Sequence, residues 1–143
     1  SIYHYFKSKD EIGLESLKYI HKYFIDNIFS LVYDKNLKDE EKIKLVVKKT
    51  DEYFLNSKGG CLLGNLALEV SSENIEFKEA IKEYFTAWED ALVNIFKNKY
   101  EESKARTIAK EYVALIQGSI MMMNLYDDSS NYLQVGEKLI SLI

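Results

Sequence analysis

The apolar residues of this chain recur every three or four positions along most of its length, and this spacing predicts amphipathic helices. We expect long helices at about 8–33, 39–56, 71–99, 103–126 and 129–143, separated by polar or glycine-containing segments. A shorter apolar helix is expected at 61–70. The polar residues that we expect to cap the long helices are Ser8, Asp39, Ser71 or Ser72, Ser103, and Ser129 or Ser130.

The helix expected at 103–126 is apolar around nearly its whole circumference, so both of its sides must be covered. Gly118 lies in its middle and costs the helix about 1 kcal/mol relative to alanine. Close approach of another helix would explain a glycine at this position.

The composition predicts a single all-α domain of about six helices. The 143 residues are 47% apolar and include six glycines and no proline, and no alternating run of β-branched residues predicts a strand. The single cysteine excludes an internal disulfide and is compatible with a reducing compartment. The uncharged run Tyr112–Tyr126 is shorter than the ~20 residues of a membrane span, so we expect a cytoplasmic protein without a membrane segment.

The first eleven residues carry the densest chemistry of the chain. Ser8 and Glu11 have the spacing of a capping box, in which each side chain bonds the other residue's backbone N–H. Aromatic rings, a histidine and two lysines lie just before this cap. Phenol hydroxyls, ammonium groups and N–H groups at a helix start can all donate hydrogen bonds to phosphate oxygens. The alternative is a packed helix corner with solvated lysines.

The run Ser1–Glu11 resembles the end of the recognition helix and the start of the next helix in TetR/AcrR-family transcriptional regulators. Gly60–Ala67, with Phe85 and Trp88, resembles the ligand-binding domain of one branch of that family. Family members carry two further helices before this point, so we expect a fragment that does not read DNA by itself. The net charge of −4 then says little about DNA binding, because the basic residues would lie mainly in that preceding segment.

The resemblance implies a fold, a domain division and a set of DNA contacts. The fold is a TetR-like C-terminal helical bundle, with residues 1–10 as the remnant of a truncated helix-turn-helix head and 11–143 as the ligand-binding and dimerisation domain. Operator DNA would bind through the mostly missing head. The residues expected to contact it are Tyr5, Lys7 and Lys9 at the phosphates, and Tyr3 and His4 near bases or sugars.

Aromatic and methionine side chains are abundant for a small helical body, and such side chains adapt to apolar ligands of varied shape. The resemblance implies a small-molecule effector, and the candidate cavity residues are Phe54, Cys61, Asn65, Phe85, Trp88, Tyr112, Gln117 and Met121. The alternative for each is ordinary core packing. Asn65 and Gln117 need a partner in backbone, water or ligand, because a buried unpaired amide costs a few kcal/mol. Cys61 is either a thiol sensor at a helix start or a small buried apolar residue.

In the resembled family the last two helices of each subunit form a four-helix homodimer interface. The residues that match this role are Val113, Ile116, Gln117, Ile120, Tyr132, Leu139 and Ile143. The pattern alone does not separate core from interface on these helices.

These features together favour a ligand-responsive DNA-binding transcriptional regulator, a repressor that a small apolar molecule releases from operator DNA. The alternative is a helical dimeric small-molecule-binding or adaptor module without DNA binding. An enzyme is not expected, because no nucleophile–base pairing, phosphate loop or metal spacing occurs. We therefore expect no catalytic residue, no metal and no cofactor. The lone His21 has no ligand-like neighbour in sequence.

Overall fold

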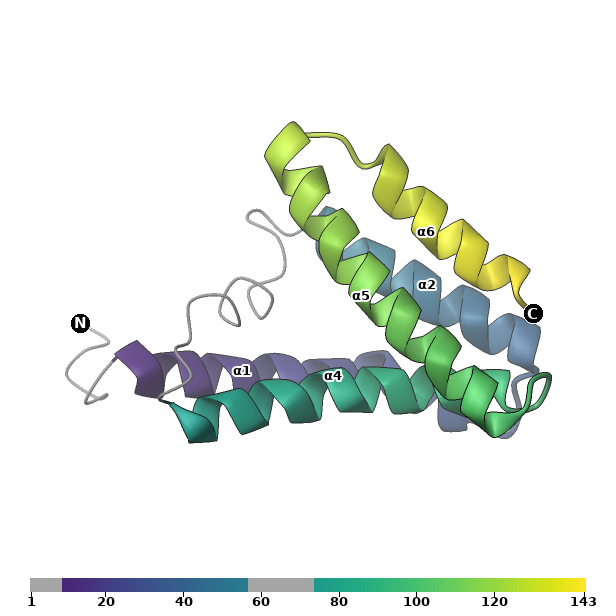
Figure 1. Cartoon of the computed structure of the whole chain (residues 1–143), viewed down its shortest axis with the longest axis horizontal. Helices are drawn as coiled ribbons and strands as arrows, with labels where there is room; N and C mark the ends of the chain where they lie inside the picture. The colour runs from purple at the N-terminus through teal and green to yellow at the C-terminus, as the bar shows by residue number, and fades with distance from the viewer. Residues whose placement is uncertain (1–8, 57–73) are drawn as a thin grey trace.

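The computed structural model describes residues 9–56 and 74–143, with side chains from residue 11 onward in the first range, and its elements there are helical (Figure 1). The elements are α1 (Lys9–Asn27), the 3-10 helix η2 (Phe29–Tyr33), α2 (Asp39–Leu55), α4 (Ile75–Phe96), α5 (Glu102–Tyr126) and α6 (Ser130–Ser141). The all-α prediction is confirmed. The helix expected at 61–70 and the Ser8 cap lie outside the described residues.

The first long helix ends earlier than expected. We predicted one helix to Tyr33, whereas α1 ends at Asn27 and the chain tightens into the 3-10 helix η2. In a 3-10 helix, residues three apart lie on the same side. This winding buries both Phe29 and Val32, and the Asn94 side chain of α4 donates a 2.9 Å hydrogen bond to the Val32 carbonyl.

The caps of α2 and α4 differ from the predictions. Asp39 is the first residue of α2 rather than its cap, and the Lys38 N–H donates to the Glu41 carboxylate at 2.8 Å. Neither Ser71 nor Ser72 opens α4. Asn74 does so, because its side-chain oxygen accepts the Phe77 N–H at 3.0 Å.

The last two helices form an antiparallel hairpin. α5 begins at Glu102 after the cap residue Glu101, so the prediction of a Ser103 cap was wrong. Two acidic residues at this end favour a start there, since they complement the positive end of the helix dipole. α5 ends at Tyr126, and its C-cap residue Asp127 adopts a left-handed conformation with φ 53°. α6 starts after Ser129, as predicted.

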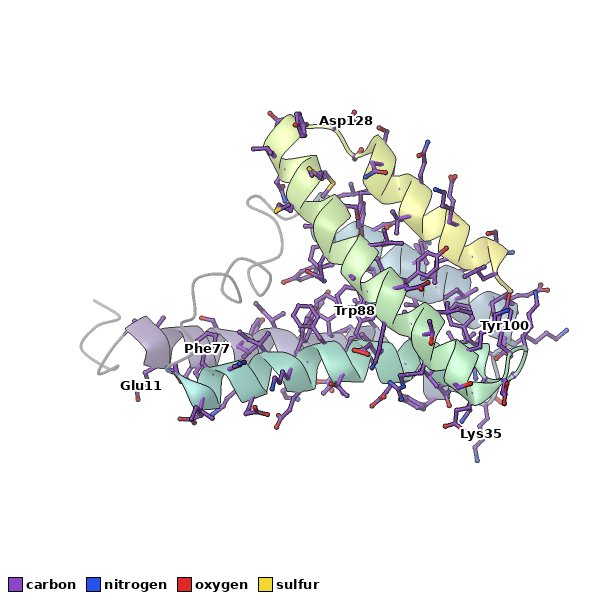
Figure 2. All side chains as sticks on the ribbon, in the orientation of Figure 1. Glu11, Lys35, Phe77, Trp88, Tyr100 and Asp128 are labelled. Carbon is purple, nitrogen blue, oxygen red and sulfur yellow. The ribbon has the colours of Figure 1, made fainter. Side chains whose placement is uncertain are left out.

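The helices are arranged as a long pair and a body. α1 and α4 run side by side, and their free ends extend away from the remaining helices (Figure 1). Gly13 makes this pairing close, because a Cβ there would lie 2.6 Å from the Phe77 ring. α5 packs across α4, while α6 packs on both α5 and α2. Trp88 lies in the middle of the molecule, where these elements meet (Figure 2).

Aromatic rings fill the centre of the fold. Phe24 of α1 is fully buried and lies 5.6 Å, centroid to centroid, from Trp88 of α4. Phe54 of α2 stacks on Trp88 at 6.2 Å with an interplanar angle of 2°. Tyr132 of α6 meets the edge of the Phe54 ring at 6.4 Å. One cluster of rings therefore connects α1, α2, α4 and α6.

Candidate functional site

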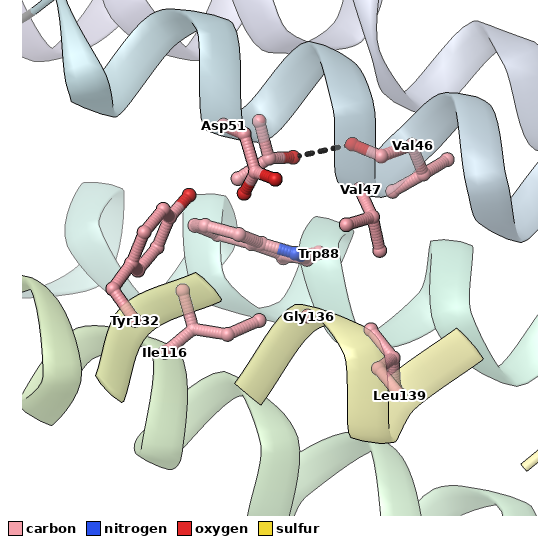
Figure 3. Close-up of a pocket in the computed structure, with 9 residues that line it drawn as sticks. Val46, Val47, Asp51, Trp88, Ile116, Tyr132, Gly136 and Leu139 are labelled. Carbon is pink, nitrogen blue, oxygen red and sulfur yellow. Dashed lines mark hydrogen bonds between the residues drawn. The ribbon is translucent and has the colours of Figure 1, made fainter. Parts of the chain in front are cut away.

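A small pocket lies beside Trp88, between α2, α4, α5 and α6 (Figure 3). Its lining residues are Val46, Val47, Thr50, Asp51, Trp88, Ile116, Tyr132, Gly136 and Leu139. The free space is about 20 Å³ for the centre of a water-sized sphere. A single water needs roughly 10–15 Å³ by this measure, so the pocket has room for one water or one small head group.

The polar groups of this pocket come from α2 and α6. The Tyr132 side chain is 2% exposed, and its hydroxyl is directed toward the half-buried Asp51 carboxylate (Figure 3). Burial raises the pKa of Asp51, and the Tyr132 hydroxyl partly offsets this effect. Burial also raises the pKa of Tyr132, and the Asp51 charge adds to the rise. The buried Thr50 hydroxyl donates to the Val46 carbonyl at 2.7 Å.

Gly136 lets α6 approach α2 at this pocket. A Cβ on Gly136 would lie 2.9 Å from Val47 Cγ1 and 3.9 Å from Asp51 Oδ1. The first distance is shorter than real Cβ contacts allow, and Val47 is a stiff β-branched residue. The packing of α6 on α2 therefore requires glycine at position 136. The Asp51 carboxylate lies beside this glycine.

The residues predicted to bind a ligand do not gather in one place. Of the eight predicted residues, Trp88 lines the small pocket. The buried Phe54 of α2 stacks on the Trp88 ring. Phe85 is half-buried, and the centroid of its ring lies 5.2 Å from that of Tyr84. Tyr112 and Met121 line a separate surface groove on α5. Cys61 and Asn65 lie outside the described residues, so their roles stay predictions.

Gln117 carries a polar group that the fold leaves without a partner. Both its amide nitrogen and its amide oxygen are buried, and neither has a hydrogen-bond partner among the described residues. The neighbouring positions Val113 and Ile120 on the same side of α5 are buried apolar residues. A buried unpaired amide is costly, so a water or a ligand atom must satisfy it. The role of Gln117 in ligand binding stays a prediction, supported by the energetic cost of leaving its amide unpaired.

His21 on α1 is the other buried polar group of interest. Its Nε2 atom is buried without a hydrogen-bond partner in residues 9–56 and 74–143, and its ring lies in a T-shaped arrangement with Tyr84 of α4, with centroids 5.7 Å apart. Burial lowers the pKa of His21, while the nearby Glu83 charge opposes that shift. The imidazole is thus favoured in its neutral form at the α1–α4 contact.

A wide groove runs over the outer face of the α5–α6 hairpin, with a volume of about 660 Å³. Its residues are Glu111, Tyr112, Ala114, Leu115, Gly118, Ser119, Met121, Met122, Asn131, Val135 and Lys138. Exposed apolar side chains follow α5 along and beyond it: Leu115 at 52%, Met121 at 49%, Met122 at 44%, Leu125 at 69% and Tyr126 at 72%. A Cβ on Gly118 would meet no atom within 4 Å. The predicted close approach at Gly118 is therefore not made by any described residue of the protomer.

The residues predicted for the dimer interface lie mostly inside the protomer. Buried against the other helices are Val113, Ile116, Ile120, Tyr132 and Leu139. Gln117 and Ile143 are half-buried. The exposed apolar side chains of α5 instead belong to a different face of the same helix. Pattern alone had not separated these two faces, because both are apolar.

Sequence reasoning did not single out Asp51, Thr50 or Gly136. A signal was present for two of them. Thr50 and Asp51 follow Val46 and Val47 by one helical turn, which places a hydroxyl and a carboxylate on the apolar face of α2. Gly136 gave no signal of its own, since a glycine on a short helix has several explanations.

The residues predicted to contact DNA cannot be placed from the fold. Tyr3, His4, Tyr5 and Lys7 lie outside the described residues, and so does the side chain of Lys9. Among the described helices, none combines the length and apolar character of a membrane span. The described side chains include no group of three or more His, Cys, Asp or Glu residues arranged to hold a metal ion.

Comparisons with known proteins place this chain among transcriptional regulators. Residues 40–138 match the family described as transcriptional regulator LmrA/YxaF-like, C-terminal domain. The whole chain is 25% identical, over 147 residues, to the uncharacterized HTH-type transcriptional regulator YxaF of Bacillus subtilis strain 168, of which it covers 76%. A 99-residue stretch, 68% of this chain and 45% of the relative, is 25% identical to transcriptional regulator AcuR of Cereibacter sphaeroides.

Two solved structures share the fold. A TetR transcriptional regulator from Legionella pneumophila aligns with a TM-score of 0.86 at 20% identity, covering 99% of this chain and 77% of that protein. The regulatory protein TetR from Rhodobacter sphaeroides aligns with a TM-score of 0.82 at 19% identity, covering 99% and 79%. Because the family match spans well over half of its residues, this chain belongs to the TetR family of transcriptional regulators and carries an LmrA/YxaF-like C-terminal domain.

Proposed function

We propose that this chain is the sensing part of a DNA-binding repressor, which a small molecule releases from its operator. Residues 1–10 then belong to a helix-turn-helix head, and residues 11–143 form the ligand-binding and dimerisation domain. The observation that carries the ligand response is the pocket beside Trp88. It brings the half-buried Asp51 carboxylate and the Tyr132 hydroxyl to one apolar pocket, as a site for a polar ligand group would.

The release mechanism follows from the position of α1. This helix comes directly after the opening motif, so its N-terminal end would carry the head. Its buried Phe24 contacts Trp88, which is a wall of the pocket. A ligand that shifts Trp88 acts on α1 through this contact. The ligand must prefer one of the two positions of α1, because only differential affinity shifts a population. Heads moved from a separation of one DNA turn, about 34–36 Å, no longer fit successive major grooves.

DNA binding is tested with the full-length protein and a pool of random duplexes. We expect enrichment of a palindromic sequence with half-sites about one turn apart. Replacing both Lys7 and Lys9 with alanine should weaken binding to the selected duplex and reduce its salt dependence by about two phosphate contacts. The matched control is Lys78→Ala, which removes an exposed lysine from α4. Failure to enrich any sequence would contradict DNA recognition.

The outer face of the α5–α6 hairpin is the proposed dimer interface. The exposed apolar side chains of α5 follow this face, and large apolar patches on a protein surface mark association sites. Gly118 leaves open space in the middle of this face, where a second α5 can approach closely. Glu111 of α5 and Lys138 of α6 both line the groove. A two-fold contact can therefore pair Glu111 of one copy with Lys138 of the other, and the reverse.

The oligomeric state tests this interface. Leu125→Glu places a charge in the apolar face without touching the described core, since Leu125 is 69% exposed. We expect the full-length wild type to elute as a dimer. The dissociation constant of the variant dimer should be higher by about tenfold or more. The matched control is Tyr19→Glu on α1, at a side chain that is 75% exposed. Equal effects of the two substitutions in light scattering would place the interface elsewhere.

A further inference from the structure

The pocket beside Trp88 contains an acidic group with no counter-charge. Asp51 forms no ion pair with any residue in the described part of the chain. Its carboxylate is half-buried, and its Oδ1 atom lies 3.9 Å from the position of a Cβ on Gly136. Enclosed carboxylates are normally paired with a cation or with several hydrogen-bond donors. The described part of the chain therefore supplies this carboxylate with no cation.

The groups around Asp51 complement a cationic donor. The Tyr132 hydroxyl is directed to the same space, and its oxygen carries lone pairs that can accept a hydrogen bond (Figure 3). The Thr50 hydroxyl donates its proton to the Val46 carbonyl, so the lone pairs of its oxygen can still accept a hydrogen bond. The Trp88 ring forms a wall, and aromatic faces attract cations. An ammonium group has three N–H donors and no acceptor, so it matches a carboxylate and two hydroxyl oxygens.

The size and the access of the pocket agree with such a group. The free space of about 20 Å³ holds a head group of about the size of one water and excludes a ring. Among the lining residues, Val47 and Asp51 are the more exposed, and both belong to α2. A ligand therefore enters beside Asp51, with its apolar part left at the seam between α2 and α6.

We propose that this pocket binds the protonated primary amine of a small amphipathic compound, with Asp51 as its counter-charge and Tyr132 and Thr50 as hydrogen-bond acceptors. The inference rests on the proposed ligand-responsive function and names the chemical class of the effector's head group. An anionic effector is disfavoured at this position, because the carboxylate would repel it. A neutral alcohol lacks the charge and has fewer donors.

The test compares three ring compounds that differ in charge: benzylammonium, benzyl alcohol and benzoate. Binding to the full-length protein is measured by calorimetry at neutral pH. We expect benzylammonium to bind most tightly and benzoate most weakly. Asp51→Asn keeps the shape of the side chain and should weaken benzylammonium binding about tenfold or more, with little effect on benzyl alcohol.

The matched control is Glu52→Gln, which removes a charge from the adjacent, exposed position on α2. It should leave benzylammonium binding unchanged. Tyr132→Phe tests the hydroxyl and should weaken the amine without abolishing its binding. Circular dichroism confirms that each variant is folded.

Acid should weaken amine binding, because protonation removes the Asp51 charge. Burial raises the pKa of Asp51, so the loss begins at a higher pH than for an exposed aspartate. Tyr132 of α6 is the other titratable group that lines the pocket; α4 and α5 contribute only Trp88 and Ile116 to it.

Equal binding of the three compounds, or equal effects of Asp51→Asn and Glu52→Gln, would overturn the inference, and the pocket would then hold water alone. The proposed function is judged separately. DNA selection and dimerisation with the full-length protein can succeed while the amine fails, and their failure would count against the repressor itself.

Discussion

At the scale of single residues, the least predictable feature was the pair formed by Asp51 and Tyr132. The sequence placed Tyr132 at a dimer interface and gave Asp51 no role, whereas the fold brings both to one internal pocket. Periodicity tells which face of a helix is apolar, but it does not tell which other helix covers that face. The contact between residues 51 and 132 depends on how α6 returns across α2, which no local pattern encodes.

The burial of Asp51 makes the free energy of unfolding depend on pH. Its folded-state pKa is raised above the ordinary value of the unfolded chain, so in that pH window the folded protein binds the proton more. The contribution of this group to stability therefore falls as the pH rises through the window. Relative to Asp51→Asn, the wild type should lose stability as the pH rises above about 3.9, the ordinary pKa of an aspartate in an unfolded chain. Urea unfolding at a series of pH values measures this difference.

Glu52→Gln serves as the control for that series, because it removes an exposed carboxylate one position away. A stability difference between wild type and Asp51→Asn that stays constant with pH would contradict the assigned burial effect.

At the scale of elements, the sequence predicted the long helices but not all of their ends. Each described α-helix was anticipated from its apolar spacing, since that spacing extends over many residues, whereas the 3-10 helix η2 was not. The starts of α4 and α5 were misplaced because several polar residues compete at each one, and the geometry selects one of them. Asn74 wins at α4 by bonding the Phe77 N–H, and this choice depends on how the helix approaches its neighbours.

The close contact of α1 with α4 gives an element-scale prediction. A Cβ at position 13 would lie 2.6 Å from Cε2 of the Phe77 ring, which is itself 2% exposed. Gly13→Ala should therefore push the two helices apart and lower the free energy of unfolding by about 1–3 kcal/mol. Denaturant unfolding of the variant measures the loss.

The double variant Gly13→Ala/Phe77→Leu provides the check. A smaller side chain at position 77 should recover part of what the added methyl costs, so that the two substitutions are not additive. Simple addition of the two losses would mean that Gly13 and Phe77 do not constrain each other.

At the scale of the whole molecule, the family and the all-α fold were both predicted and are both confirmed. The resemblance of short motifs carried the family, and the family match also confirms a regulator rather than an enzyme. The interior was less accessible to sequence reasoning. The abundance of aromatic side chains suggested a ligand cavity. Most of these rings instead pack against one another, and the pocket beside Trp88 is small.

Trp88 contacts rings from α1, η2 and α2 as well as Tyr84 of its own helix. Trp88→Ala should therefore lower the free energy of unfolding by about 3–5 kcal/mol, because it leaves a large cavity at the junction of these elements. Thermal and urea unfolding measure the loss. A loss below about 1 kcal/mol would mean that the neighbouring rings collapse into the space. Tests of ligand binding are consequently better made at Asp51.

The end of α6 is fastened to the turn between α4 and α5. The Tyr100 hydroxyl donates to the Leu142 carbonyl at 2.8 Å, and the Lys99 ammonium donates to the Ile143 carbonyl at 3.1 Å. The hairpin of α5 and α6 is thus closed at both ends, by its own turn at one and by these bonds at the other. α1 packs on α4 and η2, so a movement of α1 need not disturb this hairpin. In the proposed repressor, effector binding would therefore move the two DNA-reading heads while the contact between the subunits keeps its geometry.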